Sequence, residues 1–347
     1  MGWMIGAGLV LAWGLAVAHP VELVATALNA AFGPLLLVSL LAAALSWRAG
    51  LRRGGWGFGA VAALYVATAG LRVGSMARPG RAEGPEITVV SYNVLFEGGD
   101  PDVTVRLLAD QNADVWFLQE VTPAWAAAIV DLAPHRVVAD RKGTQGLAVL
   151  SRYPLSRPRL WHDEDGRIVG QCVDAMIEGS PHGLCHLHLA SPSWAIVTSD
   201  GPLQRLSRLE DNARRRARQW RRLEAEMQEH YATRIIAGDF NTLPTESFLR
   251  DARRRWVDAT RSRAWIRAGA TWPQVAAIRH RPPWLLGQLA AGGPWFRIDY
   301  LLCDPSVAVR DAQRRHGGGS DHLPVRATLA LPAGVTSPRS EGRPTSR

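Results

Sequence analysis

Residues 234–243 of this chain are Arg-Ile-Ile-Ala-Gly-Asp-Phe-Asn-Thr-Leu. Two isoleucines and an alanine lead into a glycine, and Asp239 and Asn241 follow two positions apart, a pattern typical of a buried strand that opens into a loop. Side chains two positions apart on an extended chain point to the same side, so a carboxylate and a carboxamide are expected together. Such a pair can hold a water or a metal and bond a phosphate oxygen, or it can close an ordinary Asx turn. This stretch alone leaves both interpretations open.

The charge of the chain is arginine-based. The net charge is +9, and Lys142 is its single lysine. Many arginines lie between Arg205 and Arg222 at helical spacing, which a solvated helix face explains most simply. Attraction to anionic lipid headgroups or to nucleic acid is the alternative. The lipid surface is favoured if the domain is anchored in a membrane, as the N-terminal sequence predicts.

Three uncharged apolar stretches, about residues 1–18, 23–47 and 54–71, occupy the N-terminal part of the chain. Each is near the length that crosses a bilayer as a helix, so residues 1–74 are predicted to form a membrane domain of three transmembrane helices. A signal peptide accounts less well for the first stretch, because no basic residue precedes its apolar run and two further stretches follow.

The short loops between these stretches predict the orientation. The first loop has no lysine or arginine, whereas the second carries Arg48, Arg52 and Arg53 and is therefore expected in the cytoplasm. Three arginines after the third stretch oppose this orientation, but charge next to a long translocated domain carries less weight. The rest of the chain is predicted to lie on the extracytoplasmic side of the plasma membrane.

The remaining sequence divides into three parts. Residues 75–85 are rich in Pro, Gly and charge and are interpreted as a linker. Residues 86–331 are predicted to be one domain, since their number suffices for a single large core. Residues 332–347, rich in Pro, Arg, Ser and Thr, are predicted to be a disordered tail.

Cysteine spacing argues against a disulfide. Cys172 and Cys185 are expected on neighbouring strands joined by a turn centred near Pro181. In that register the two residues do not face each other, so they are interpreted as small buried side chains.

Polar residues recur where strand-like runs end. Asn93 closes the first such run, Glu120 the second, and His188 a later one. His186 and His188 share one face of their run and could ligate zinc, but no third nitrogen or thiolate ligand lies at a suggestive spacing. Zinc is therefore the weaker interpretation of this pair.

The C-terminal part adds three more polar residues. Asp299 interrupts an apolar run, and Asp321 and His322 are adjacent, shortly after three glycines. An aspartate beside a histidine on a tight loop offers a metal ligand or a proton shuttle.

Taken in order, seven short motifs resemble the endonuclease/exonuclease/phosphatase superfamily: Ser91-Tyr-Asn-Val, Leu118-Gln-Glu-Val, Leu150-Ser-Arg-Tyr-Pro, His188-Leu-Ala-Ser, Gly238-Asp-Phe-Asn, Arg297-Ile-Asp-Tyr and Ser320-Asp-His-Leu-Pro. Their shared order is far more specific than any one of them, and it covers about residues 86–331. The resemblance implies a four-layer α/β sandwich, in which two mixed sheets pack face to face between outer helices and the site lies at one end of the sheets. Here that fold would follow the three transmembrane helices.

The resemblance also implies a metal site. Asn93 and Glu120 resemble the metal end of the family's site, with Glu120 as a direct ligand and Asp321 joining it. Mg²⁺ or Mn²⁺ is the expected ion, because carboxylate oxygens are hard ligands and the chain has no thiolate cluster.

The remaining roles are likewise implied by the resemblance. Asp239 would orient or deprotonate the attacking water, and Asn241 would hold the phosphoryl group. His322, oriented and kept charged by Asp299, would stabilise the pentacovalent state, and His188 would contact a phosphate oxygen. A hard cation and imidazolium groups suit the charge that builds up during in-line attack on phosphorus.

The three-helix anchor together with this domain further resembles bacterial membrane-bound members, including a teicoplanin-resistance group, and Thr271-Trp-Pro fits that group. We therefore expect a membrane-anchored, metal-dependent phosphoesterase that hydrolyses a phosphate ester or pyrophosphate, lipid-linked, at the outer membrane surface. Two alternatives stay open. One is an extracytoplasmic endonuclease or exonuclease with the arginine helix as its nucleic-acid track, and the other is a non-catalytic membrane-bound binding protein.

Overall fold

The computed structural model describes most of the chain, namely residues 32–52, 54–60, 62–63, 77, 79–97, 99–192, 201–231, 234–244, 246–260, 269–274, 294 and 296–333. Among them, no helix is both long enough and apolar enough to cross a membrane. The first predicted span, 1–18, lies outside the described residues. The second is described from residue 32 as helix α3 (Phe32–Arg48), and only the start of the third is described. Three transmembrane helices thus stay a prediction.

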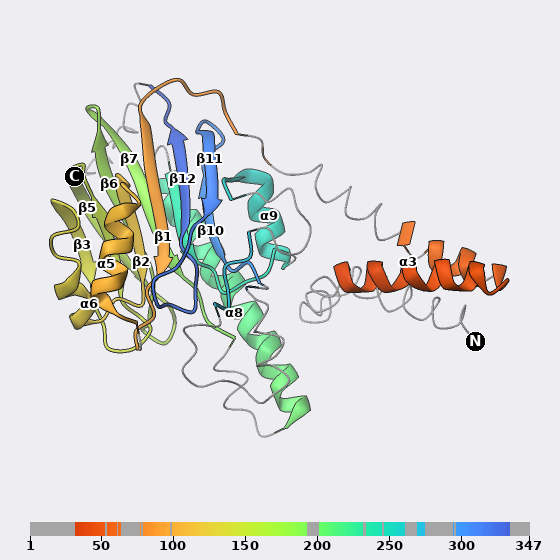
Figure 1. The fold of residues 1–347 in the computed structure, drawn as a ribbon. Coiled ribbons are helices and arrows are strands. Elements are labelled where there is room, and N and C mark those ends of the chain that lie inside the picture. Colours follow the sequence, from red (N-terminus) through yellow and green to blue (C-terminus); the bar gives the residue numbers. More distant parts are fainter. Residues whose placement is uncertain are drawn as a thin grey trace, which may run out of the picture.

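The chain from Glu86 to Ala330 is built on two six-stranded sheets (Figure 1). The first has the strand order β11-β12-β1-β2-β4-β3, with β1 (Glu86–Asn93), β2 (Val115–Gln119), β3 (His135–Ala139), β4 (Leu147–Ser151), β11 (Ala308–Arg314) and β12 (Val325–Ala330). The second has the order β5-β6-β7-β8-β10-β9, with β5 (Leu155–His162), β6 (Ile168–Ile177), β7 (Ser180–His188), β8 (Arg234–Asp239), β9 (Val257–Asp258) and β10 (Asp299–Cys303). Both are mixed, because β1 pairs parallel with β2 and β7 pairs parallel with β8 among otherwise antiparallel neighbours.

Helices cover the outer faces of both sheets. Leu108 of α5 (Pro101–Asp110) and Trp125 of α6 (Pro123–Ala128) pack on the first sheet. Trp220 of α8 (Pro202–His230) and Phe248 of α9 (Ser247–Arg255) pack on the second. These layers confirm the predicted α/β sandwich of two mixed sheets with outer helices.

The inner faces of the two sheets share one apolar core. Val89 and Phe117 from the first sheet meet Val173, Leu184 and Ile235 from the second, and all five are almost fully buried. Burying a side chain of this size stabilises the fold by about 1.5–3 kcal/mol. The alternate residues of the same strands face the helices, so the strands are apolar on both faces.

Strand pairing brings the polar ends of several strands together. Asn93 ends β1 and pairs with the last residue of β2, directly before Glu120. His188 and Asp299 both pair with Asp239, which ends β8. Parallel neighbours end at the same edge of a sheet, so these residues gather at one end of the sandwich.

The prediction about the cysteines was wrong, because Cys172 and Cys185 form a disulfide. The turn between β6 and β7 lies at Glu178 and Gly179, with φ values of 47° and 79°, and not near Pro181. Positive φ at both central residues is the geometry of a two-residue type I′ hairpin turn. This register places the two cysteines directly opposite each other, with their Cα atoms 4.2 Å apart.

We expect the double substitution Cys172→Ala with Cys185→Ala to lower the free energy of unfolding by about 3 kcal/mol, the value for a closed loop of roughly 15 residues. Chemical denaturation with and without reductant checks this. Reductant should destabilise the wild-type protein and leave the double variant unchanged. Equal effects of reductant on both proteins would contradict the disulfide.

Candidate active site

Asn93 connects the metal end of the predicted site to its nucleophile end. Its Nδ2 atom donates to Glu120 Oε1 at 3.1 Å and to Asp239 Oδ2 at 3.2 Å, and its Oδ1 atom accepts from the Leu95 amide. The second Glu120 oxygen accepts from the Phe96 amide at 3.0 Å. Asn93 therefore bridges two carboxylates, one on each sheet, through its amide hydrogens.

The loop after β8 directs Asp239 into the site. A Cβ atom on Gly238 would lie 1.9 Å from the Leu187 carbonyl oxygen, so only glycine permits this approach of β8 to β7. Asp239 Oδ1 accepts from the Asn241 amide at 2.8 Å, and Asn241 Nδ2 donates to the Leu189 carbonyl at 3.0 Å. Both interpretations of the opening stretch thus apply, because one Asp239 oxygen closes an Asx turn while the other faces the site.

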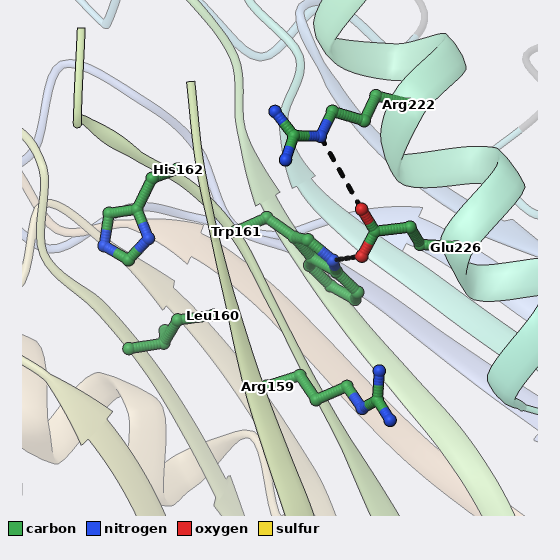
Figure 2. A pocket seen from close by; sticks show the side chains of 6 residues that line it. All are labelled: Arg159, Leu160, Trp161, His162, Arg222 and Glu226. Carbon is green, nitrogen blue, oxygen red and sulfur yellow. Dashed lines mark hydrogen bonds and ion pairs between the residues drawn. The ribbon is translucent and has the colours of Figure 1, made fainter. Parts of the chain in front are cut away.

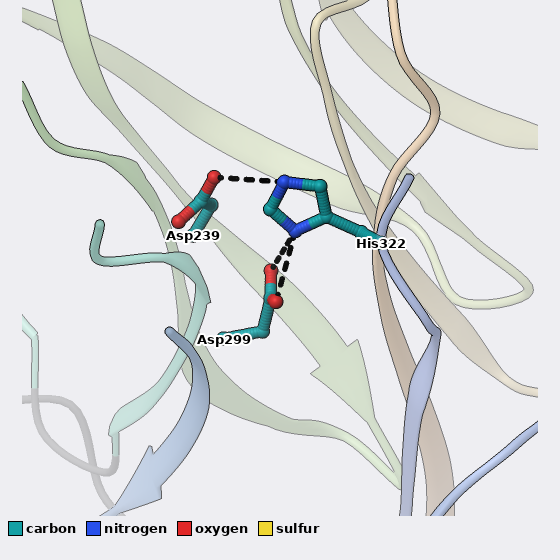
Figure 3. Close-up of side chains that lie close together, drawn as sticks. All are labelled: Asp239, Asp299 and His322. Atoms are coloured by element: carbon teal, nitrogen blue, oxygen red, sulfur yellow. Dashed lines mark hydrogen bonds and ion pairs between the residues drawn. The ribbon is translucent and has the colours of Figure 1, made fainter. Parts of the chain in front are cut away.

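His322 lies between two carboxylates (Figure 3). Its Nδ1 atom is 3.0 Å from Asp299 Oδ2, and its Nε2 atom is 3.6 Å from Asp239 Oδ2. Burial opposes protonation, but the Asp299 and Asp239 charges outweigh it and hold the pKa of His322 well above 6.5. Burial also raises the pKa of Asp239 to about 6, against the opposing charges of His322 and His188.

The ligand atoms of Asp239, Asp299 and His322 lie within 4.8 Å of one another, close enough for a shared metal ion. Both ring nitrogens of His322 already face carboxylates, Nδ1 at 3.0 Å from Asp299 and Nε2 at 3.6 Å from Asp239, which argues against that use. An imidazolium donates from both ring nitrogens and has no free lone pair for a metal. This group is better described as a charged histidine held between two carboxylates.

His188 faces the same carboxylates from β7. Its Nε2 atom lies 3.7 Å from Asp239 Oδ2 and 4.0 Å from Glu120 Oε1. His186, two residues earlier, instead contacts Gln119 Nε2 at 2.6 Å in the interior. Burial, reinforced by His188, places the pKa of His186 well below 6.5. Among the described residues, no group of side chains placed to share a metal ion contains both histidines.

Thr271 and Trp272 contact two of the site aspartates, which the motifs did not predict. The Asp321 Oδ2 atom accepts from Trp272 Nε1 at 2.9 Å, and the Asp321 Oδ1 atom lies 4.0 Å from His322 Nε2. Thr271 Oγ1 accepts from the Asp299 amide at 3.3 Å, so Thr271 and Trp272 support both acids. The sequence analysis used Thr271-Trp-Pro only for the likeness to membrane-bound members, so these contacts with the two aspartates were not predicted.

The donor set fits a hard divalent cation such as Mg²⁺ or Mn²⁺. The Asp321 Oδ1 atom is buried and has no hydrogen-bond partner among the described residues. Glu120 is 8% exposed and is joined to Asp239 of the same group by the Asn93 amide. Buried carboxylate oxygens with spare lone pairs are what such an ion requires.

All eight predicted site residues thus form one connected group: Asn93, Glu120, His188, Asp239, Asn241, Asp299, Asp321 and His322. Their individual roles stay predictions.

A separate hollow of about 450 Å³ lies between β5 and α8 (Figure 2). None of the eight site residues lines it. In its wall, Glu226 accepts from Trp161 Nε1 and pairs with Arg222 at 3.6 Å. This hollow is not part of the site.

Residues 90–322 match the model of the Endonuclease/Exonuclease/phosphatase family. The chain belongs to this family. The match includes all eight site residues and confirms the superfamily resemblance. Members of the endonuclease/exonuclease/phosphatase family are phosphoester hydrolases, so the chain has a hydrolase fold. The likeness to membrane-bound bacterial members stays a prediction.

Solved structures show the same fold. A D. rerio TDP2 complexed with a single-strand DNA product gives a TM-score of 0.53 at 18% identity, covering 70% of this chain and 98% of that one. A functionally unknown conserved protein from Enterococcus faecalis gives 0.51 at 16% identity, covering 71% and 100%. An AP endonuclease from Archaeoglobus fulgidus gives 0.50 at 18% identity, covering 70% and 98%. No curated protein matches the sequence significantly. At these identities the similarity shows the fold alone.

We expect His322 of the metal-free protein to remain protonated above pH 6.5, and Asp299→Asn to lower its pKa because one neighbouring charge is lost. Since the folded pKa is raised, the stability that His322 contributes is fully present below about pH 6.5 and is lost as the pH rises through the folded pKa. An NMR titration of the imidazole measures both proteins. An identical pKa in wild type and Asp299→Asn would disprove the pairing.

Proposed function

We propose that this protein is a membrane-anchored, Mg²⁺- or Mn²⁺-dependent phosphoesterase that acts on a lipid-linked phosphate ester or pyrophosphate. The observation that carries the chemistry is the Asp239 carboxylate, which accepts from Asn93 and lies within 4 Å of both His188 and His322. A purely binding domain does not require this many ionisable groups at one buried point, so catalysis is favoured over the non-catalytic alternative.

Each residue in the group has a step that its geometry suits. Asp239, with a pKa of about 6, is ionised at neutral pH and can take the proton of an attacking water. The His322 imidazolium donates toward the same space and stabilises the charge that develops on the phosphoryl oxygens. Asn241 uses one amide hydrogen on Leu189 and keeps another for a phosphoryl oxygen.

Glu120 and Asp321 are the residues that would hold the cation, which supplies Lewis-acid stabilisation of the phosphoryl oxygens. Asn93 keeps the Glu120 carboxylate next to Asp239.

The membrane anchor is supported by large apolar side chains that face solvent in the N-terminal helices. Leu45, Trp47 and Trp56 are between 56% and 68% exposed, and Leu40 and Leu41 are at least half exposed. Exposed apolar surface of this kind marks contact with a membrane or a partner. The disulfide supports an extracytoplasmic catalytic domain, because disulfides persist in oxidising compartments.

The proposed substrate class follows from the tether. The linker, 75–85, extends at most about 3.5 Å per residue, so the domain stays near the bilayer, where a lipid-borne substrate is concentrated.

The arginines of α8 attract an anionic surface less than their number indicates, because five of them pair with acids of the same domain: Arg214, Arg215, Arg216, Arg218 and Arg222. This pairing weakens the case for α8 as a nucleic-acid-binding surface as much as the case for its attraction to lipid headgroups.

We expect Asp239→Asn and His322→Ala each to lower turnover by on the order of 10³-fold while the fold is retained. The physical reason is the loss of the water-activating carboxylate or of the imidazolium. Turnover of a soluble phosphodiester, bis(4-nitrophenyl) phosphate, with Mg²⁺ or Mn²⁺ measures this, with circular dichroism as the control for folding. Wild-type turnover in excess chelator would exclude the metal, and near-normal turnover of either variant would exclude its assigned role.

For the substrate, we expect phosphate release from proteoliposomes that carry a phosphatidic acid or an isoprenoid pyrophosphate, and little cleavage of plasmid or oligonucleotide at the same Mg²⁺ concentration. The reason is the confinement of enzyme and lipid to one surface. Asp239→Asn is the matched control. Asp239-dependent cleavage of nucleic acid without lipid dephosphorylation would establish the nuclease alternative.

A further inference from the structure

One face of α8 holds the loop that follows β7. Gln219 Oε1 accepts from the Ala190 amide at 3.0 Å, Arg216 Nη1 donates to the Ala190 carbonyl at 3.2 Å, and Asn212 Nδ2 donates to the Ser191 carbonyl at 3.0 Å. The three side chains are spaced four and three positions apart, which places them on one side of the helix. The backbone of this loop is therefore bound through side chains of α8.

Arg216 also binds the loop that follows β8. Its Nε atom lies 3.3 Å from Thr242 Oγ1, and its Nη2 atom donates to Glu246 Oε1 at 2.8 Å. The Arg216 side chain is 5% exposed, as is that of Glu246, so the guanidinium charge is balanced inside the protein. A buried arginine is retained where its several donors are used at once, and here they reach two different loops.

These two loops begin at site residues. The first follows His188 directly, and the second contains Asn241, next to Asp239. They are bonded to each other on the site side as well, since the Leu189 amide donates to the Asp239 carbonyl at 3.0 Å and Asn241 Nδ2 donates to the Leu189 carbonyl. Arg216 thus closes the same pair of loops from the side of α8.

We infer that Arg216 is a positioning residue for the reaction, holding the loop that follows His188 at the end of β7 against the loop that follows Asp239 at the end of β8 and carries Asn241. This inference rests on the proposed phosphoesterase chemistry. Arg216 acts through the backbone of Ala190 and the side chain of Thr242, and not on substrate. A shift of about 1 Å in reacting groups can cost on the order of 10²-fold in rate, so a clamp remote from the chemistry has a measurable effect.

The test is Arg216→Lys, which keeps the charge and the pairing with Glu246 but has one ammonium group in place of the guanidinium fork. Such a group does not reach Ala190, Thr242 and Glu246 together. The matched control is Arg254→Lys on α9, because Arg254 is exposed and its pairing with Asp251 stays within that helix. Both variants are made in the full chain, purified in detergent.

Two readouts are combined. Turnover of bis(4-nitrophenyl) phosphate with Mn²⁺ should fall between about tenfold and a hundredfold in kcat for Arg216→Lys with KM nearly unchanged, and should not change for Arg254→Lys. Hydrogen exchange of the metal-free protein should rise in peptides covering 189–192 and 241–246, while strands β1, β2 and β8 stay protected. The exchange readout does not depend on activity.

The inference is overturned if Arg216→Lys keeps wild-type kcat, or if exchange rises equally across both sheets, which would indicate a general loss of stability. If Arg216→Lys fails to fold, the test uses Asn212→Ala, which leaves the Arg216–Glu246 pair in place. This variant must raise hydrogen exchange at residues 190–191 and lower kcat. Unchanged exchange and kcat would also overturn the inference. A wild-type protein inactive on every phosphoester would refute the proposed function alone, because the exchange comparison still decides whether Arg216 holds the loops.

Discussion

The Asp239 carboxylate is the point at which the two sheets become one site. It ends β8 in the second sheet, yet its Oδ2 atom accepts from Asn93 at the end of β1 in the first sheet and lies near His322, which precedes β12 in that same sheet. Asp299 pairs with it in register on β10 and holds the other side of the His322 ring. The site therefore exists only when the sheets stack, and the apolar core between them fixes its dimensions.

Burial gives this arrangement its chemistry. In water a carboxyl and an imidazole would titrate near their ordinary values, but inside the protein each responds to loss of solvent and to its neighbours. Burial raises the pKa of Asp239 to about 6, near the pH at which a general base is useful. The two carboxylates hold the pKa of His322 high, which keeps it charged as a donor. The proposed roles of Asp239 as a base and His322 as a charged donor rest on these two shifts.

Residues around the site hold the site aspartates and the neighbouring loops in place. Thr271 and Trp272 fix the backbone of Asp299 and the carboxylate of Asp321, and α8 binds the loops behind His188 and Asn241 through a buried arginine. Arg216 therefore holds parts of the fold together, and four further arginines of α8 pair with acidic side chains. The disulfide beneath the same helix joins β6 to β7 and restrains the strand that carries His188.

The sequence by itself determined the residue types and their order. Short motifs at strand ends are local patterns that can be read from the sequence. Their order carried the family resemblance, and that resemblance implied the sandwich and the eight site residues. The tertiary structure alone decided the rest. Whether Cys172 faces Cys185 depended on a turn at Glu178 and Gly179 that shifts the register, and composition near Pro181 was a poor guide to it. The raised pKa of His322, the bridge made by Asn93 and the partners of Arg216 all join residues far apart in the chain. Distances and burial of that kind arise from packing between sheets and helices, which no local pattern encodes.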